Sequence, residues 1–104
     1  MSVLIELSMF PLGQGESVGE EVSRIIDMIR GSGHAYKLTA MGTIIETSNL
    51  TDALALVERA YSVLENAGCQ RVYACVKLDI RKGESLRMKQ KIDSVVDRIG
   101  NVDQ

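Results

Sequence analysis

Three acidic residues lie inside stretches of the sequence that otherwise have the pattern of β-strands: Glu6, Glu46 and Asp79. Acidic residues are depleted in strands, and a buried carboxylate is costly unless a partner compensates for its charge. Exposure near a sheet edge, or an ion pair with Lys77 or Arg81, explains Asp79. Glu46 fits this explanation less well, because it directly follows a β-branched Thr-Ile-Ile run. Two interpretations of Glu46 therefore stay open: an exposed strand end, or a carboxylate that holds a cationic or amidine-like ligand.

The other residues that could support catalysis or metal binding form no recognisable constellation. His34 is the single histidine, and it lies in a turn without a neighbouring nucleophile, so we interpret it as a polar surface residue. The carboxylates lack the spacing of a shared metal site. The glycines at 13, 15 and 19 match neither the dinucleotide fingerprint nor a phosphate loop. The sequence therefore predicts a protein that is not an enzyme and that uses no metal or cofactor.

Length and composition favour a single domain that spans residues 1–104. The chain is 45% hydrophobic and 25% charged, with a formal net charge of -2. This balance provides no basic surface for nucleic acid or anionic membranes, and no apolar run is long enough to cross a bilayer. The N-terminal stretch lacks a basic leader region, so we expect a cytoplasmic protein. Cys69 and Cys75 are then expected to be reduced thiols, although their spacing also allows a disulfide.

The first half of the sequence predicts a strand, a helix and a hairpin. Residues 2–10 alternate as a strand, and Ser17 begins a helix through a capping box. The stretch 36–46 predicts two short strands. They meet at Gly42, which we expect to act as a pivot because glycine adopts a positive φ at little cost.

The second half predicts a helix, a long strand and a last helix. Asn49 or Thr51 caps the second helix and Gly68 ends it, residues 71–81 form the strand, and Ser85 caps the third helix. The order β-α-β-β-α-β-α is that of an α+β, ferredoxin-like split βαβ fold with an added C-terminal helix. By analogy with that fold we expect a four-stranded antiparallel sheet in the order 4-1-3-2.

One face of the predicted sheet is apolar and the other is mixed. The strand residues that we expect under the first two helices are Val3, Ile5, Leu7, Val72, Val76 and Leu78. The expected helix stripes are Val18, Val22, Ile25, Ile26 and Ile29, then Leu54, Val57, Tyr61, Leu64 and Ala67, and finally Met88, Ile92, Val95, Val96 and Ile99. The second sheet face mixes apolar and charged side chains, which suits open water poorly. We therefore expect a homodimer or homotetramer.

Four stretches of the sequence resemble the thiamine-binding protein family of the MTH1187/YkoF-like superfamily, formerly the uncharacterised group DUF77 or UPF0045. These stretches are Met9–Gly13, Ser17–Val18, Tyr36–Glu46 and Lys77–Arg81, the last followed by Lys91-Ile92. The most specific part is M-G-T-x-x-E, which runs from Met41 to Glu46. Many members carry a glycine after that glutamate, where this chain has Thr47.

This resemblance implies a ferredoxin-like subunit that packs into dimers and tetramers. It also implies binding of thiamine, or of its hydroxymethylpyrimidine part, without catalysis. On the motif positions, Glu46 would pair with the thiazolium cation or accept a hydrogen bond from the 4-amino group. Ser8 and Thr43 would bond the ring nitrogens, and Met9 and Met41 would contact the aromatic ring.

A second interpretation comes from a different class of protein. The chain would be an oligomeric regulatory or assembly module resembling ACT-type domains, with another small metabolite or an anion bound at a subunit interface.

Overall fold

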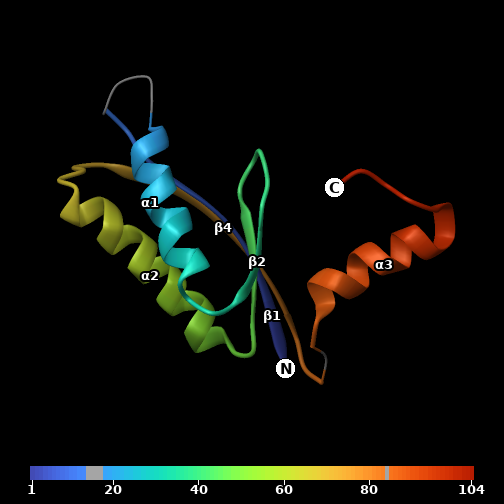
Figure 1. The fold of residues 1–104 in the computed structure, drawn as a ribbon. Helices are drawn as coiled ribbons and strands as arrows, with labels where there is room; N and C mark the ends of the chain where they lie inside the picture. Colours follow the sequence, from blue (N-terminus) through green and yellow to red (C-terminus); the bar gives the residue numbers. More distant parts are fainter. Residues whose placement is uncertain (14–17, 84) are drawn as a thin grey trace.

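The computed structural model describes residues 1–13, 18–83 and 85–104, and these form four strands and three helices (Figure 1). The elements are β1 (Ser2–Pro11), α1 (Gly19–Arg30), β2 (Ala35–Leu38), β3 (Thr43–Thr47), α2 (Leu50–Asn66), β4 (Val72–Arg81) and α3 (Arg87–Ile99). The sheet has the order β2-β3-β1-β4, and every neighbouring pair is antiparallel. This is the predicted order 4-1-3-2 read from the other edge, so the ferredoxin-like fold class is confirmed.

The helices divide between the two sides of the sheet. α1 and α2 lie side by side on one face, whereas α3 lies on the other side and extends away from the strands (Figure 1). The extension shows in the overall shape, because the Cα radius of gyration is 15.0 Å and the principal extents are 45 × 30 × 21 Å. A compact chain of this length has a radius of gyration of about 13 Å.

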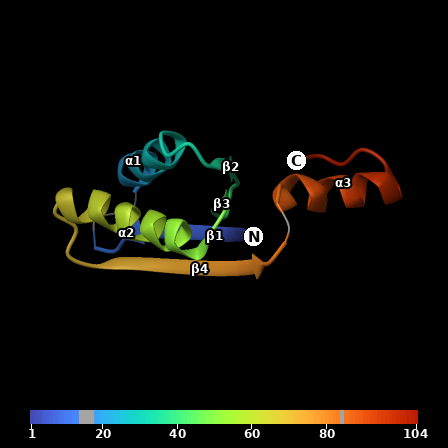
Figure 2. The same cartoon turned by 90° about the horizontal axis from the view of Figure 1, so that it is seen from below.

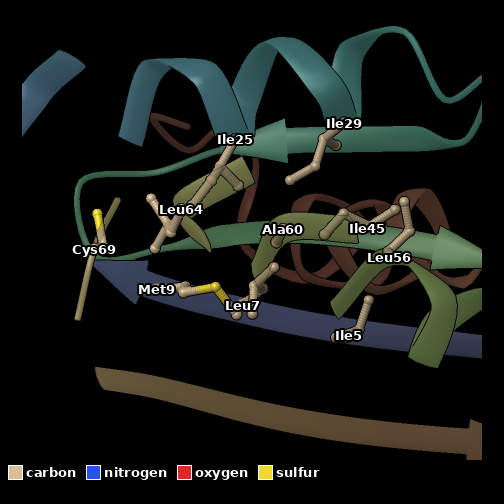
Figure 3. Packing of buried hydrophobic residues seen from close by; sticks show 10 residues of the cluster. All are labelled: Ile5, Leu7, Met9, Ile25, Ile29, Ile45, Leu56, Ala60, Leu64 and Cys69. Atoms are coloured by element: carbon tan, nitrogen blue, oxygen red, sulfur yellow. The ribbon is translucent and has the colours of Figure 1, made fainter. Parts of the chain in front are cut away.

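The core lies between β1, β3 and the pair α1 and α2 (Figure 3). The predicted alternation of β1 is confirmed, because Val3, Ile5, Leu7 and Met9 are all buried on the helix side. The predicted stripe of α1 is confirmed at its centre, where the two fully packed residues are Ile25 and Ile29. The buried residues that form this cluster are Ile5, Leu7, Met9, Ile25, Ile29, Ile45, Leu56, Ala60, Leu64 and Cys69.

The predicted stripe of α2 is confirmed at Leu64 and Val57, which lie in or against the core, and is wrong at Leu54 and Tyr61. The buried residues of α2 are Ala53, Leu56, Ala60 and Leu64, whereas the predicted Leu54 and Tyr61 are 49% and 44% exposed. The two alanines let the helix axis approach the sheet closely, and larger residues at these positions would hold it away. The helix therefore turns its small side chains toward the sheet. The predicted stripe was selected for large apolar side chains, so it missed these alanines.

The predicted burial of β4 is also wrong. Only its first residue, Val72, packs against the core, and Val76 and Leu78 are 41% and 38% exposed. β4 forms an edge of the sheet, and Figure 2 shows that the helix layer ends at α2 while the sheet continues to β4. The apolar face of this strand therefore has no helix over it within the chain.

The turn and cap predictions have mixed outcomes. Asn49 is the cap of α2, since its side-chain oxygen accepts a hydrogen bond from the backbone N–H of Asp52 at 2.7 Å. Gly68 follows the helix with φ +85°, as expected for a C-terminal glycine. Ser17 lies outside the described residues, and α1 begins at Gly19. Gly42 does not adopt a positive φ, so its predicted role as a left-handed pivot is wrong.

Candidate functional site

A cavity of about 190 Å³ lies at the end of the sheet where β1, α1 and the β2–β3 turn meet. Four of the five predicted site residues line it: Ser8, Met9, Met41 and Thr43. The remaining lining residues are Leu7, Phe10, Val18, Val22, Ile25, Ile26, Ile29, Leu38, Thr39, Ala40 and Gly42. Residues separated by more than 30 positions in the chain are thus brought together, because β1 and β3 are antiparallel neighbours whose register pairs Leu7 with Thr43.

The hydroxyl group of Thr39 holds the β2–β3 turn that forms one wall of this cavity. Thr39 Oγ1 donates a hydrogen bond to the carbonyl oxygen of Gly42 at 2.8 Å and accepts from the N–H groups of Met41 and Gly42 at 3.3 and 3.2 Å. A side chain at Gly42 would be crowded, since a Cβ atom would lie 3.1 Å from the carbonyl oxygen of Leu7. The turn therefore packs directly on the backbone of β1.

The described residues around this cavity are apolar or neutral. Thr43 and Met9 are buried, whereas Met41 is 86% exposed and lies at the rim. The lining residues that carry a hydroxyl group are Ser8, Thr39 and Thr43, and none of the described lining residues is ionisable. Ser8 alternates with the buried Leu7 and Met9 along β1, so its side chain starts from the opposite face of the strand. Such a site suits a neutral aromatic ring held by hydroxyl groups and sulfur contacts. It does not offer a counter-charge to a cation.

The size of the cavity limits what it can hold. An apolar protein cavity of about 150 Å³ accommodates a benzene molecule, whereas sites for drug-sized ligands span about 300–1,000 Å³. The cavity of about 190 Å³ therefore matches one six-membered ring with small substituents. A ligand with two rings would leave the second ring outside.

The structure does not bring Glu46 to this cavity. Thr43 and Ile45 of β3 are buried toward the helices, and Glu46 lies on the opposite face of the strand. Its carboxylate accepts hydrogen bonds from the Ser2 hydroxyl at 2.6 Å, the Arg87 backbone N–H at 2.8 Å and the Met88 backbone N–H at 3.0 Å. The last two are the first amides of α3, which otherwise lack partners at a helix N-terminus.

The Glu46 carboxylate therefore caps the N-terminal amides of α3 from another strand, in place of the predicted Ser85. The residue preceding the helix is Leu86, which provides no side-chain hydrogen bond and adopts a left-handed conformation with φ 57°. A carboxylate at this position also interacts favourably with the helix dipole. Partial burial raises the pKa of Glu46, but the hydrogen bonds from Ser2, Met88 and Arg87 outweigh it, so the pKa lies below its usual value.

A buried arginine completes this attachment of α3. The Arg87 side chain is 4% exposed and pairs with the Asp79 carboxylate, with Nη1 3.0 Å from Oδ1. Arg87 Nη2 also donates to the backbone oxygens of Ser2, at 3.0 Å, and of Asp79. Its Nε has no hydrogen-bond partner among the described residues. Lys91 contributes a second cation to Asp79 at 2.8 Å, and the hydrogen bonds from Lys91 and Arg87 lower the pKa of Asp79.

Arg87 is a functional residue of the fold that the sequence reasoning missed. The ion-pair interpretation of Asp79 holds, but with partners on α3 rather than the predicted Lys77 or Arg81. One signal was available, because an arginine in the first turn of a helix opposes the helix dipole and needs a nearby anion. Its partners are 8 and 85 residues away in the chain, so no local pattern identifies them.

A wider groove of about 680 Å³ lies between the second sheet face and α3. Leu4, Ile44, Met88 and Ile92 contribute its apolar surface. Six charged side chains of the described part of the chain line it, including Asp103, and five of the six have partners: Glu6 faces Lys77 at 3.8 Å, Asp79 binds Lys91, and the Lys37 ammonium donates to Gln104 at 3.2 Å. The groove is larger than the cavity at the β2–β3 turn, but most of its charged side chains already bind one another. The cavity at the β2–β3 turn is therefore the stronger candidate site.

Three further observations bear on the class of protein. Within residues 1–13, 18–83 and 85–104, no cluster of His, Cys, Asp or Glu is suited to hold a metal ion. None of the helices described has the length and apolar character to span a membrane. Cys69 is buried and Cys75 is exposed, and both are free thiols.

The fold and cavity thus define a small ferredoxin-like α+β protein with a neutral, ring-sized site. Residues 5–96 match the family described as "Thiamine-binding protein". The UPF0045 protein Mb1933 of Mycobacterium bovis is 41% identical over 95 residues, which cover 91% of this chain and 92% of that protein. The chain therefore belongs to the thiamine-binding protein family, whose curated relatives carry the UPF0045 designation.

Solved structures agree with the fold. Hypothetical protein MJ1052 of Methanocaldococcus jannaschii superimposes with a TM-score of 0.78 at 30% identity, covering 90% of this chain and 95% of that one. A DUF77 protein of Bacillus cereus gives a TM-score of 0.81 at 26% identity and covers 94% and 93%. A putative thiamine biosynthesis/salvage protein of Thermotoga maritima gives 0.78 at 18% identity, covering 91% and 99%, and this similarity concerns the fold.

Proposed function

We propose that this protein binds thiamine or its hydroxymethylpyrimidine part without transforming it. The observation that carries the proposal is that Ser8, Met9, Met41 and Thr43, chosen from motif positions, line one ring-sized cavity. Membership of a family described as thiamine-binding supports the ligand class. A solved relative of the same fold is titled a putative thiamine biosynthesis/salvage protein, which agrees with this ligand class.

The proposed binding mode places only the pyrimidine ring inside the cavity. Met9 and Met41 provide polarisable contacts to the ring faces, and the hydroxyl group of Thr43 bonds a ring nitrogen or the amino group. The contact of Ser8 stays a prediction from its motif position, because Ser8 alternates with the buried Leu7 and Met9 along β1. The thiazolium ring stays at the rim, because the cavity holds about one ring and its described lining carries no acid. Glu46 is not part of this proposed mode, since its carboxylate already binds the N-terminus of α3.

Isothermal titration with thiamine, the pyrimidine alone and the thiazole alone tests this proposal. We expect thiamine and the pyrimidine to bind and the thiazole to give no saturable heat. Thr43→Val keeps the shape of the side chain and removes the hydroxyl, so we expect binding to weaken by about tenfold. The matched control is Thr47→Val, a buried threonine of the same strand and face that does not line the cavity. Absence of heat with all three compounds would contradict the proposal.

The wider groove favours the second candidate function, an ACT-like regulatory module. Lys37, Lys77 and Lys91 border this groove, and its volume of about 680 Å³ is within the usual range for a small metabolite. An anionic metabolite bound there would lie near a surface that self-association could cover. The Thr43→Val variant would bind less tightly in the cavity and would leave binding in the groove unchanged. Titration of this variant and of the unmodified chain with inorganic phosphate and with thiamine phosphates therefore separates the two functions.

Self-association into a homodimer or homotetramer belongs to the proposal as well. The sequence predicts a second sheet face that mixes apolar and charged side chains. In the structure Tyr73 of that face is 51% exposed and Leu4 is 8% exposed, while Val76, Leu78 and Ile80 of β4 are exposed on the helix side. Exposed apolar surface that a second copy could cover is therefore present on both faces of β4.

A further inference from the structure

Thr39 lines the cavity at the β2–β3 turn, but the turn itself uses the full hydrogen-bonding capacity of its hydroxyl group. A threonine hydroxyl has one hydrogen to donate and two lone pairs that accept. The hydrogen is donated to the carbonyl oxygen of Gly42 at 2.8 Å, and the lone pairs accept from the N–H groups of Met41 and Gly42 at 3.3 and 3.2 Å. Thr39 therefore contributes to the cavity through the backbone that it holds and not through a bond to a ligand.

The backbone of residues 39–42 does not have the conformation that usually closes a tight hairpin. Such turns favour one or two residues with positive φ, which glycine commonly supplies. None of these four residues has a positive φ, Gly42 included. The carbonyl oxygen of Gly42 also accepts from the backbone N–H of Thr39 at 2.8 Å, so one residue gives it two hydrogen bonds. The shape of the turn therefore depends on the Thr39 side chain.

A close approach to β1 fixes the other end of the turn. A Cβ atom at Gly42 would lie 3.1 Å from the carbonyl oxygen of Leu7 and 3.7 Å from Cγ of Glu6. The turn otherwise stands at the tip of the β2–β3 hairpin (Figure 1). The backbone of Met41 thus lies between the Thr39 hydroxyl on one side and the contact of Gly42 with β1 on the other.

Met41 is the side chain whose place this turn determines. It lines the cavity and is 86% exposed, so it lies at the mouth. Methionine has three rotatable bonds and a thioether that makes favourable contacts with aromatic rings. A side chain this flexible covers a ring more effectively when its backbone is already held over the mouth, because less freedom is then lost on binding.

We propose that Thr39 is a positioning residue of the ligand site, whose hydroxyl group holds the turn so that Met41 covers a pyrimidine ring in the cavity. This role rests on the proposed function, because it requires that the ring occupies the cavity. Thr39 makes no hydrogen bond to the ring, and its hydroxyl group affects affinity through Met41.

A double-mutant cycle tests this role by isothermal titration with the hydroxymethylpyrimidine. Met41→Ala removes the thioether contact and should weaken binding about fivefold. Thr39→Val removes the hydroxyl group from a side chain of the same shape and should also weaken binding about fivefold, whereas Thr39→Ser should keep the affinity. The double variant should bind no more weakly than Met41→Ala, because both substitutions act on one contact. Losses that multiply to about twenty-five-fold would mean independent effects and overturn the role.

Thr47→Val is the matched control for a loss of stability without a change at the site. The Thr47 hydroxyl also holds a turn, since it donates to the carbonyl oxygen of Asn49 at 2.7 Å, but at the other end of β3 and outside the described lining of the cavity. We expect Thr39→Val and Thr47→Val to lower the thermal midpoint similarly, while Thr39→Val alone weakens binding. Equal weakening by both substitutions, or reduced affinity of Thr39→Ser, contradicts the positioning role.

A measurement without ligand separates this role from the proposed function. Exchange of the Met41 and Gly42 amide hydrogens with water, followed by nuclear magnetic resonance, should be about tenfold faster in Thr39→Val and unchanged in Thr39→Ser. If the unmodified chain binds neither thiamine nor the pyrimidine, the proposed function fails, and the exchange rates still decide whether Thr39 holds the turn. If it binds them and Thr39→Val leaves the exchange rates unchanged, the positioning role alone is overturned.

Discussion

Glu46 shows how a motif residue can be engaged by the fold itself. Its carboxylate accepts three hydrogen bonds, two of them from the first amides of α3. The sequence left open whether this acid is an exposed strand end or holds a ligand, and the chain itself supplies a partner from 41 residues away. The acid was correctly recognised as unusual, but its partner could not be identified without the fold.

Replacing Glu46 with glutamine should destabilise the attachment of α3. The amide keeps one acceptor oxygen but loses the charge and the second acceptor, so we expect a loss of about 1–2 kcal/mol in the free energy of unfolding. Urea denaturation measures this loss. The matched control is Glu6→Gln, which removes an exposed carboxylate 3.8 Å from Lys77 and should change stability by less than about 0.5 kcal/mol. Equal effects of the two substitutions would contradict the capping role.

The same carboxylates predict how stability depends on pH. The pKa values of Glu46 and Asp79 are lowered in the folded chain. Their stabilising contribution is therefore complete above the pKa of the unfolded chain, about 4, and is lost as the pH falls through the lower folded values. We expect urea midpoints to decline below about pH 4.5 in the unmodified chain. Glu46→Gln should show a smaller decline, and an identical decline would contradict this origin.

At the scale of the elements, α2 demonstrates that side-chain size can mislead. The sequence places Leu54 and Tyr61 in the core, whereas the structure buries Ala53 and Ala60. The amphipathic period was recognised, but the phase of the stripe depends on how closely the helix approaches the sheet. The distance between α2 and the sheet depends on the side chains of both elements and not on the helix alone.

Substitutions on α2 distinguish the two orientations. Ala60→Leu introduces three carbon atoms at a position with 0% exposure, so we expect a loss of about 1–3 kcal/mol through overpacking. Tyr61→Ala, at the adjacent exposed position, should cost less than about 1 kcal/mol in the dissociated chain. Thermal denaturation at low protein concentration compares them. A larger cost for Tyr61→Ala would support the orientation predicted from the sequence.

Other elements were predictable because their signals are local. The alternation in β1, the Asn49 cap and the glycine after α2 each depend on residues close together in the chain. The exposure of β4 is different, because it depends on where the helix layer ends. For the candidate site, the motif positions identified four lining residues, and Thr39, which organises the turn by its hydroxyl, was missed.

At the scale of the whole molecule, the protruding α3 explains the elongated shape. The radius of gyration of 15.0 Å exceeds the value of about 13 Å for a compact chain of this length. A helix that is held mainly at its first turn gains little from tertiary packing along the rest of its length. We therefore interpret α3 as the least stable helix of an isolated chain.

Hydrogen exchange measured by mass spectrometry tests this interpretation. In dilute solution, peptides from the C-terminal half of α3 should exchange faster than those of α1 and α2, because fewer buried contacts oppose local opening. Protection of α3 should increase with protein concentration if a second copy covers its stripe. Uniform slow exchange of α3 at every concentration would contradict both statements.

The three-residue separation of Thr43 and Glu46 has a consequence for variation of this strand. Odd steps along a strand alternate between its sides, so one residue points into the ring-sized cavity and the other holds a distant helix. Inserting a single amino acid between them would turn both toward the same side. The fixed length of M-G-T-x-x-E is thus what allows one short strand to serve two opposite surfaces, and variants that lengthen it should lose one of those surfaces even when every original side chain is retained.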